Sequence, residues 1–424
     1  MKSVLARCDR NILRRLREIG WEAEKNKMNA YVVGGFVRDL LLHKNNFDVD
    51  VVVEGDAVKL AQLLAQRKKA KVTIYPVFKT ATLMDAQGGQ LDLSSARKEH
   101  YAYSGALPAV TLGSIHDDLF RRDFAINAMA ISIHPDQFGM VIDDFRGQKD
   151  LDEKSIRVLH DQSFKDDPTR ILRAVRFEQR LHFKIERHTL DLMKKALSKH
   201  ADDDVKPPRY FEEFKKILKE DQPVRCLERL HQFKGLEFLG DNYRMTPSIK
   251  KSLKNIEKNR KALKKRFALK QFDLQILYLM ALWHKRSGKS TEKTMSRFHF
   301  TREDKKRILE SRNVISLSRR LSVKRMRPSD VYRILKPLSY ETVAFLTTQT
   351  KNPRIQKRIF GFLKQDQSVA LSVNGEDLKR LGIKEGRMIG DILKKCFDAK
   401  LDGKVRSKKQ EMRYAQKWIQ RDKD

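Results

Sequence analysis

The sequence predicts a small α/β head followed by a long, basic, all-α body. Between Tyr31 and Asp143, short β-branched runs alternate with amphipathic helical segments, as in an α/β domain. After Asp161 the apolar residues recur at helical spacing, so the rest is expected to be mainly helical. The charge divides in the same way. Residues 1–200 hold 34 Lys and Arg against 27 Asp and Glu, a balance of +7, and the remainder holds 56 against 28, a balance of +28.

The basic second half predicts a polyanionic partner, most often nucleic acid. A solvated, lysine-rich surface is the alternative, and a membrane surface is a weaker third. The longest apolar run, Ile276 to Trp283, is less than half of the ~18 residues that a membrane helix needs. The N-terminus lacks the apolar core of a signal peptide. The scattered cysteines favour a reducing, cytoplasmic setting; they are Cys8, Cys226 and Cys396.

Turn residues and periodicity set the expected elements. An amphipathic helix is expected within residues 1–25. The expected strands are Ala30–Val33, Phe47–Val53, Lys71–Tyr75, Thr80–Met84, Gln90–Leu93 and Met129–Ile133. The expected helices of the head are Gly35–Leu42, Asp56–Gln66 and Arg121–Ala128. Later helices are expected at 167–182, 188–198, 208–220 and 222–233, from about 247 to 364, and at the basic C-terminus after turns at Gly382 and Gly386.

A Gly-Gly turn lies between the first expected strand and the first expected helix of the head. Gly34 and Gly35 let the backbone approach a ligand closely, and the helix N-terminus behind them offers free N–H donors. Arg38, one helical turn further on, could reach the same anion. The pattern predicts an anion cradle, with a plain strand–helix turn as the alternative.

Two aspartates interrupt the valine-rich strand that follows. Asp48 and Asp50 are two residues apart, so they lie on one strand face, and burying them unpaired would be costly. Carboxylate oxygens are the ligands that Mg²⁺ prefers, and a pair of metal ions can activate a hydroxyl and stabilise a leaving phosphate. Beside an anion cradle, the pair predicts a site for two Mg²⁺ ions. A hydrogen-bonded edge strand with outward acids is the alternative.

The stretches GGFVRD at 34–39 and DVD at 48–50 resemble the opening signature of a known family, the class II tRNA nucleotidyltransferases and bacterial poly(A) polymerases. These enzymes belong to the polymerase-β-like nucleotidyltransferases. The resemblance implies that the two aspartates hold the catalytic Mg²⁺ ions, and that the glycine turn and Arg38 contact a nucleoside triphosphate. It covers about residues 30–235 through four ordered motifs and is loose beyond 240.

The second motif is RRDFAINA at 121–128. From the residues alone, arginines and an acid at a helix start would form a surface ion pair of little value. The stretch resembles the family's RRDFTINA motif, which implies that Arg122, Asp123 and Asn127 help to select ribose and contact phosphate. Ala125 stands where the family usually has threonine.

The third motif is DDPTRILRAVRF at 166–177, with Pro168 at a first helical position and Asp167 as its N-cap. Arg170, Arg173 and Arg176 follow at three-residue steps along one stripe. Without interleaved acids they repel one another unless an anion, such as a nucleoside triphosphate, lies among them. A solvated arginine face is the alternative.

This segment resembles the family's EDxxR motif and its RAxRF extension. The resemblance implies that Asp167 and Arg170 act as an amino-acid template that forms hydrogen bonds with the edge of the incoming base. A carboxylate accepts from an exocyclic amino group, and a guanidinium donates to a ring nitrogen or carbonyl. Arg173 and Arg176 match positions that contact nucleotide or phosphate. Asp166 replaces a glutamate that is common in the family.

The fourth motif, RYFEEF at 209–214, resembles a later helix motif in which Arg209 and Glu213 brace the nucleotide-binding helix. At i, i+4 spacing, a simple intrahelical ion pair is an equally good interpretation. Asp92 lies on a short strand that is expected to neighbour Phe47–Val53. It is either a third metal carboxylate or a structural residue. The residues that follow, up to Val110, resemble the family's flexible loop, which helps to switch base specificity.

The resemblance implies an enzyme that adds A or CCA to the 3′ end of tRNA without a nucleic-acid template. ATP, with CTP where CCA is added, would be the substrate, Mg²⁺ the cofactor and pyrophosphate the product. The stretches VEGD at 53–56 and DPTR at 167–170 favour the subgroup that includes A-adding enzymes. Poly(A) synthesis is the enzymatic alternative. An RNA-binding protein with a relic nucleotidyltransferase head is the alternative from another class.

Four domains are expected on this basis. Residues 1–145 would form the nucleotidyltransferase head, and residues 146–235 a neck with the base-recognition helices. Residues 236–365 would form an RNA-binding helical body, and residues 366–424 an RNA-binding helical tail. The expected partner is the acceptor arm of tRNA, held through phosphate contacts and shape. No membrane and no obligate protein partner is implied.

Overall fold

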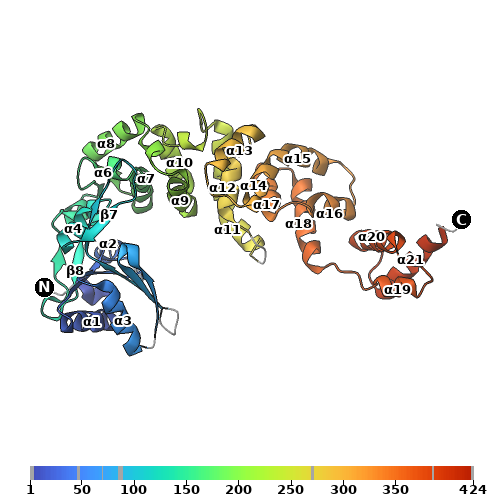
Figure 1. Cartoon of the computed structure of the whole chain (residues 1–424). Helices are drawn as coiled ribbons and strands as arrows, with labels where there is room; N and C mark the ends of the chain where they lie inside the picture. Colours follow the sequence, from blue (N-terminus) through green and yellow to red (C-terminus); the bar gives the residue numbers. More distant parts are fainter. Residues whose placement is uncertain are drawn as a thin grey trace. The chain divides into compact units, whose positions relative to one another are not determined.

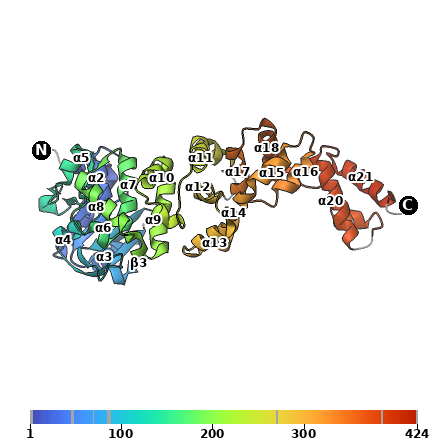
Figure 2. The same cartoon turned by 90° about the horizontal axis from the view of Figure 1, so that it is seen from above.

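The computed structural model describes residues 4–44, 48–68, 70–84, 89–268, 272–383 and 386–421. The chain forms two compact units, Met1–Tyr243 and Arg244–Asp424. The first is an α/β unit, blue to yellow-green in Figure 1, and the second is helical, yellow to red; both are seen from above in Figure 2. The predicted fold class is confirmed, and the finer division into four domains stays a prediction. Within the described ranges, no helix has the length and apolar character needed to cross a membrane.

A mixed sheet forms the centre of the first unit. Among the described residues it has seven strands in the order β3-β4-β5-β2-β1-β8-β9. Strands β2 and β5 run parallel, and every other neighbouring pair is antiparallel. The strands are β1 (Asn29–Val33), β2 (Asp50–Glu54), β3 (Lys71–Tyr75), β4 (Thr80–Met84), β5 (Gln90–Ser95), β8 (Ala130–Ser132) and β9 (Val141–Ile142).

Helices α1 (Arg10–Lys25) and α3 (Ala57–Lys68) pack against each other and against the sheet (Figure 1). Gly20 lets α1 approach the backbone at Ile133 closely, because a Cβ at Gly20 would lie 1.8 Å from the carbonyl oxygen of Ile133. The expected helices within 1–25 and 56–66 are therefore confirmed.

Valine covers both faces of β2, as the sequence predicts. Val51, Val52 and Val53 are all buried, and Val52 packs in a core cluster with Tyr31 and others. Asp50 shares the face of Val52 through the period of two, but it is the first residue of the strand and is exposed. The strand therefore carries its acid at an open end.

The predicted strand Phe47–Val53 begins too early. Asp48 precedes β2 and is exposed, whereas Phe47 lies outside the described residues. The two aspartates are therefore not buried inside a strand, but protein atoms around Asp50 still disfavour its charged form. Crowding between the two carboxylates remains.

The predicted helix Arg121–Ala128 is wrong. Helix α4 (Ile115–Phe120) ends just before it, and a single 3₁₀ turn, η3 (Ala125–Asn127), follows. Asp123 Oδ1 accepts a hydrogen bond from the Phe124 backbone N–H at 2.9 Å, a local bond that competes with helix formation. The arginine motif thus follows a helix instead of starting one.

Helices dominate the last third of the first unit, where α7 packs against α9 and α10. Pro168 lies one position before α7, and Asp167 still caps it by accepting from Thr169 N at 3.0 Å. The remaining elements of the unit are η1 (Val4–Arg7), α2 (Gly35–Leu41), η2 (Pro76–Phe78), β6 (Arg97–His100), β7 (Ala109–Leu112), η4 (Pro135–Gln137), α5 (Gly147–Asp152), β10 (Ser155–Ile156), α6 (Ser163–Asp166), α7 (Thr169–Leu181), β11 (Lys184–Ile185), α8 (Arg187–Ser198), η5 (Ala201–Asp204), α9 (Pro207–Lys219), α10 (Pro223–Gln232) and η6 (Glu237–Leu239).

The second unit is helical throughout its described part. Helix α12 contains the apolar run 276–283, which is buried against α11, α14 and α17. The turns at Gly382 and Gly386 have positive φ values of 86° and 142°. The elements are α11 (Pro247–Arg266), α12 (Leu274–Trp283), α13 (Gly288–Ser296), α14 (Arg302–Glu310), η7 (Ser311–Asn313), α15 (Val314–Ser322), α16 (Pro328–Leu335), α17 (Tyr340–Gln349), α18 (Pro353–Ser368), α19 (Gly375–Lys379), α20 (Arg387–Leu401) and α21 (Lys408–Arg421).

Candidate active site

A cavity of about 710 Å³ in the first unit, called the head cavity below, brings together most of the predicted site residues. Its walls come from the glycine turn before α2, the start of β2, the segment after α4, and helices α7 and α9. Asp92 and Glu213 are the two predicted residues outside its lining. The predicted residues that line it are Gly34, Gly35, Arg38, Asp48, Asp50, Arg122, Asp123, Asn127, Asp167, Arg170, Arg173, Arg176 and Arg209.

The glycine turn forms the floor at the start of α2. Gly34 has a φ of 69°, and a Cβ there would lie 2.7 Å from Arg122 Nη1, so the turn requires glycine. Arg38 is buried, and its guanidinium donates to Asn127 Oδ1 at 2.7 Å and to Asp39 Oδ1 at 2.8 Å. The arginine is thus fixed in place before any ligand arrives.

The two aspartates border the cavity at the start of β2. Protein atoms crowded around Asp50 raise its pKa to about 6, although the side chain reaches solvent through the opening. The carboxylates of Asp48 and Asp92 act in the same direction, and Arg122 acts against them. The surroundings of Asp50 therefore disfavour its charged form.

Asp92 lies beside Asp50 in the parallel register of β2 and β5, so the predicted neighbourhood of the two strands is confirmed. Its carboxylate accepts from Thr82 Oγ1 at 2.6 Å and from Gln90 Nε2 at 2.9 Å. With Asp50 it lines a second, adjoining cavity of about 420 Å³. Asp92 has protein partners of its own, and its role as a third metal ligand stays a prediction.

A buried carboxylate on α4 holds the two arginines of the second motif. Asp118 is fully buried, and Arg121 Nη2 and Arg122 Nη2 lie 2.7 Å and 2.8 Å from its two oxygens. Burial acts to raise the pKa of Asp118, but the two guanidiniums lower it below its usual value. The predicted surface pair of these arginines with Asp123 is therefore wrong, because their acid is Asp118.

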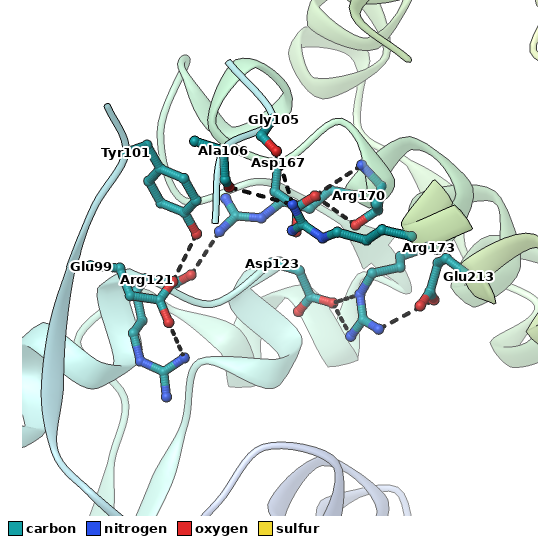
Figure 3. Close-up of polar contacts among 12 residues, drawn as sticks. Glu99, Tyr101, Gly105, Ala106, Arg121, Asp123, Asp167, Arg170, Arg173 and Glu213 are labelled. Carbon is teal, nitrogen blue, oxygen red and sulfur yellow. Dashed lines mark hydrogen bonds and ion pairs between the residues drawn. The ribbon is translucent and has the colours of Figure 1, made fainter. Parts of the chain in front are cut away.

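Asp123 instead joins the head to α7 (Figure 3). Oδ1 accepts from Phe124 N and Asn127 Nδ2, both at 2.9 Å, and Oδ2 accepts from Arg173 Nε at 2.8 Å. Burial acts to raise the pKa of Asp123, but Arg173 and the bond from Asn127 lower it to about 2. Arg173 continues to Glu213 at 3.3 Å. Asp123 thus braces the wall of the cavity.

The arginine stripe on α7 has acidic partners on and beside α9. Arg176 pairs with Glu213 at 3.2 Å and with Glu220 at 3.6 Å. The interpretation that only an external anion could offset the arginines is therefore wrong. Burial still lowers the pKa of Arg176, as do Arg173 and Arg180, against the opposing effect of the two glutamates.

Asp167 is held between its own helix and α9. Oδ1 accepts from Thr169 N at 3.0 Å and from Thr169 Oγ1 at 2.7 Å, and Oδ2 lies 2.9 Å from Arg209 Nη2. Glu213, four residues after Arg209, pairs with α7 instead. The alternative of an intrahelical pair between Arg209 and Glu213 is not adopted.

Arg170, the second member of the predicted base-reading pair, is also fixed by the protein (Figure 3). It is buried, and it donates to Ser163 Oγ at 2.6 Å and to the carbonyl oxygen of Arg121 at 2.7 Å. Asp167 and Arg170 thus both border the head cavity with restricted side chains.

The loop between β6 and β7 is anchored to the same corner. Arg209 Nη1 donates to the carbonyl oxygens of Gly105 and Ala106 at 3.1 Å and 3.4 Å. Gly105 has a φ of 71°, and a Cβ there would lie 2.7 Å from the carbonyl oxygen of Asp204. Arg209 therefore links the segment that resembles a specificity loop to Asp167.

Sequence reasoning gave no role to several residues at the cavity. Glu99 accepts from Tyr101 Oη at 2.7 Å and pairs with Arg121 at 3.1 Å and Arg97 at 3.2 Å. The alternation at 97, 99 and 101 was a usable signal, because it places these side chains on one strand face. For Asp118, the signal was its i+3 and i+4 spacing to two arginines.

Phe177 was also missed, although it ends the third motif. Its ring is buried at the head cavity, and the guanidinium carbons of Arg38, Arg173 and Arg176 lie 5.3 Å, 5.5 Å and 5.2 Å from its centroid. An aromatic ring attracts cations placed near it. The Phe177 ring thus attracts three positively charged side chains, one from α2 and two from α7.

Asp48 and Asp50 fit a divalent cation. They offer hard oxygen ligands at the edge of the cavity, and the enclosing protein atoms together with Asp48 raise the pKa of Asp50, so a bound cation would favour its charged form. Elsewhere in the described ranges, ligand atoms of Glu24, His134 and Asp136 converge within 4.8 Å, away from the lining of the head cavity.

Family models match both parts of the first unit. One, described as "Poly A polymerase head domain", matches residues 30–157, and another, "Probable RNA and SrmB- binding site of polymerase A", matches residues 182–240. The chain is 34% identical over 406 residues to an A-adding tRNA nucleotidyltransferase of Geobacter sulfurreducens. That match covers 94% of this chain and 46% of the relative, so the chain spans about half its length.

A relative of similar length is the A-adding tRNA nucleotidyltransferase of Halalkalibacterium halodurans, 33% identical over 414 residues, with 96% of this chain and 92% of that protein covered. Among solved structures, a CCA-adding enzyme with ATP matches at a TM-score of 0.82 and 34% identity, covering 98% of both chains. The Thermotoga maritima CCA-adding enzyme complexed with tRNA-CCA matches at 0.78 and 34%, covering 98% and 97%.

The fold and the head cavity are those of a nucleotidyltransferase head joined to a helical body. The chain belongs to the family of tRNA nucleotidyltransferases and bacterial poly(A) polymerases.

Proposed function

We propose that this chain adds nucleotides to the 3′ end of tRNA without a nucleic-acid template, and that addition of the terminal A is its activity. One observation carries the proposal: the head cavity brings the carboxylates of Asp48 and Asp50 together with arginines from several segments of the chain. Such a cavity suits a nucleoside triphosphate next to divalent cations. The names of the two curated relatives support the tRNA substrate.

Asp48 and Asp50 would hold Mg²⁺, with Asp92 as a candidate third ligand. When bound, Mg²⁺ activates the attacking hydroxyl and stabilises the leaving group. In the transfer, the RNA 3′-oxygen forms a bond to the α-phosphorus of the nucleotide and its proton is lost to solvent. The bond between the α-phosphorus and the bridging oxygen breaks, and pyrophosphate leaves.

The chain's own cations would hold the triphosphate. Gly34 and Gly35 would leave room for phosphate oxygens at the start of α2. Arg38 is held near these glycines by its hydrogen bond to Asn127. The Nε of Arg122 is buried without a hydrogen-bond partner among the described residues, so its N–H is available to donate to a ligand oxygen.

The stripe on α7 would complete the phosphate site. Arg173 and Arg176 border the cavity and are oriented by Asp123 and Glu213. In this assignment Asp123 positions Arg173 through Oδ2, which accepts from two guanidinium nitrogens, and does not itself face the ribose.

Asp167 and Arg170 would select the base. Because their side chains are fixed by Thr169, Ser163 and Arg209, the positions of donor and acceptor are set before the nucleotide binds. Adenine and cytosine each present an amino donor beside a ring acceptor, which this pair can recognise.

The basic helices of the second unit would hold the acceptor arm of the tRNA through phosphate contacts. In this scheme the predicted head carries out the chemistry, the neck recognises the base, and the body and tail bind RNA. A cytoplasmic location follows from the same assignment, because tRNA maturation takes place there.

Poly(A) synthesis is the second candidate, favoured by the family model of the head. The test is incorporation of labelled ATP or CTP into tRNA that ends before CCA, after the first C, or after CC. Extension of tRNA-CC with ATP alone is expected. Addition of C to the shorter substrates would indicate a CC- or CCA-adding enzyme, and long tails a poly(A) polymerase. No incorporation into any substrate would contradict every enzymatic assignment and leave an RNA-binding protein with a relic head.

A further inference from the structure

Another cavity, of about 590 Å³, adjoins the head cavity along α7 and is called the basic cavity below. The two share Arg176 and Arg180 as common lining residues, so they meet along α7. The basic cavity is lined by Lys44, Arg176, Gln179, Arg180, His182, Lys216, Lys219, Glu220, Asp221, Gln222 and Cys226.

Positive charge converges on the basic cavity from three segments of the chain. Five Lys and Arg side chains face two carboxylates in its lining. Lys44 follows α2, and Lys216 and Lys219 belong to α9. Lys44 and His182 make no side-chain hydrogen bond or ion pair with the described residues, and both are exposed. Lys216 pairs with Glu213 at 2.7 Å, so Lys44 and His182 are lining groups that the site offers to a ligand without breaking such a pair.

A buried donor points to a missing ligand. Arg176 is nine-tenths buried, and its Nε has no hydrogen-bond partner in the described part of the chain. Buried donors of this kind are rare unless something else satisfies them. Arg180 next to it is exposed, and its acid, Glu220, lies at 4.0 Å, a weak pairing. The wall shared by the two cavities thus has room for an additional anion.

We propose that the basic cavity binds backbone phosphates of the RNA strand that ends in the reacting 3′-hydroxyl. This inference rests on the proposed function, because it concerns where the RNA strand lies as it approaches the head cavity. The head cavity already has arginines for a triphosphate, so the cations beyond Arg176 and Arg180 serve a second polyanion. The strand would cross this shared wall to reach Asp48 and Asp50.

The sequence of the lining supports RNA over a free phosphate. Seven of the eleven lining residues fall within 182–240, the region matched by the RNA-binding family model. Gln179, His182 and Gln222 add further hydrogen-bonding groups among the lysines and arginines. Such groups suit 2′-hydroxyls, which are present on RNA and absent from pyrophosphate.

The test uses the full chain with Lys44→Gln and the double change Lys44→Gln, Lys219→Gln. Lys184→Gln is the matched control, because it removes the same charge from an exposed residue outside the cavity and two positions from His182. Binding of tRNA-CC is measured without nucleotide by fluorescence anisotropy, at several salt concentrations. Melting curves confirm that each variant is folded.

The first change should weaken tRNA binding several-fold and the double change further. The slope of log affinity against log salt should fall by about 0.7 per lysine removed. The control should keep the wild-type slope. Equal slopes for all four proteins would overturn the proposal. So would normal tRNA binding combined with a raised KM for ATP or weaker inhibition by pyrophosphate, which would assign the basic cavity to free phosphates.

These outcomes are separate from the test of catalysis. A chain that adds no nucleotide but shows the expected loss of binding would refute the proposed function and retain the phosphate site. If the chain adds nucleotides but its Lys44→Gln variant binds tRNA like the control, the proposed function is retained and the phosphate site is refuted.

Discussion

Arg209 Nη2 lies 2.9 Å from Asp167 Oδ2, while the Nη1 of the same guanidinium donates to two backbone carbonyls of the β6–β7 loop. One side chain on α9 therefore ties the predicted base-selecting carboxylate to the loop that resembles a specificity switch. A base that uses Asp167 Oδ2 must share this oxygen with Arg209. The arginine is thus placed to influence which nucleotide fits, without belonging to the α7 motif itself.

Replacing Arg209 by glutamine should impair nucleotide choice. A hydrogen bond to a charged group contributes roughly 1.5–3 kcal/mol, so the KM for ATP should rise about tenfold or more. Discrimination of ATP from CTP in kcat/KM should fall, because Asp167 loses its orientation. Steady-state kinetics with each nucleotide on tRNA-CC measures both effects.

The companion variant for that experiment is Arg209→Lys, which keeps the charge and loses the fork that reaches Asp167 and the loop together. It should resemble the glutamine variant in discrimination. If either variant lowers kcat/KM for both nucleotides by the same factor, Arg209 has no part in specificity and serves stability alone.

The ion pair between Asp123 and Arg173 should stabilise the contact between the head and α7. A carboxylate whose pKa falls from about 4 when unfolded to about 2 when folded contributes roughly 2–3 kcal/mol at neutral pH. This contribution is complete above about pH 4 and is lost as the pH falls towards 2. Asp123→Asn should therefore speed amide exchange at pH 7 in residues 121–128 and in α7.

Hydrogen exchange by mass spectrometry resolves these segments from the second unit. Asp191→Asn is the matched control, because its exposed partner Lys194 lies 3.9 Å away and such pairs contribute little. Unchanged protection of α7 in Asp123→Asn would mean that other packing holds the contact.

Local patterns explain which elements the sequence predicts well. The strands 71–75 and 80–84 have the predicted bounds, because alternation and turn residues lie within the segments themselves. The segment 121–128 misleads for a related reason. Its alanines and apolar residues favour a helix, but Asp123 binds its neighbouring N–H, and the capping box at Ser114 starts the helix earlier.

The site residues were predictable as a set, but their partners were not. The motifs place thirteen of the predicted residues at the head cavity, because glycine turns, capping residues and arginine spacing are legible in short stretches. The acids that hold Arg173 and Arg176 are distant in the sequence: Glu213 on α9 and Glu220 beside it follow about forty residues later, and Asp123 precedes Arg173 by 50 residues. The sequence of α7 alone cannot predict the ion pairs with Glu213, because they form only when α7 and α9 pack together.

Phe177 should matter for nucleotide binding although it carries no charge. Phe177→Leu keeps an apolar side chain but removes the ring beside Arg38, Arg173 and Arg176. Each cation–π contact contributes about 0.5–2 kcal/mol, so a rise of roughly tenfold or more in the KM for ATP is expected. Phe124→Leu is the control.

Phe124 packs edge-on against Phe177 at 5.9 Å, and the three arginines lie near the ring of Phe177, so replacement of Phe124 disturbs the same core without removing that ring. It should lower the melting temperature and leave the KM for ATP near the wild-type value. Equal changes in KM for both variants would show that Phe177 affects nucleotide binding through packing and not through the attraction of its ring for cations.

Asp50→Ala should abolish nucleotide addition and leave tRNA affinity nearly unchanged. The carboxylate borders the head cavity at the open end of β2 and is exposed, so its removal should leave the packing of the strand intact. Filter binding of tRNA-CC and single-turnover incorporation of ATP separate the two effects. A parallel loss of binding and activity would mean that the start of β2 is structural.

Charge at Asp50 should also destabilise the metal-free protein in a pH-dependent way. The folded pKa of about 6 lies above the unfolded value of about 4, so folding favours the protonated form. The destabilisation is absent below pH 4, grows as the pH rises to 6 and is complete above it. Asp50→Asn in EDTA should therefore melt at a higher temperature than the wild type at pH 8, and the difference should vanish near pH 4.

Asp92→Asn is the matched control for this charge effect. The Asp92 carboxylate accepts hydrogen bonds from Thr82 and Gln90, so its replacement should not stabilise the protein at either pH. Added Mg²⁺ should raise the melting temperature of the wild type more than that of Asp50→Asn, because a cation bound between Asp48 and Asp50 relieves the same repulsion. A gain in Asp50→Asn that is equal at pH 5 and pH 8 would mean improved packing, and would remove the electrostatic argument for a metal at this edge of the sheet.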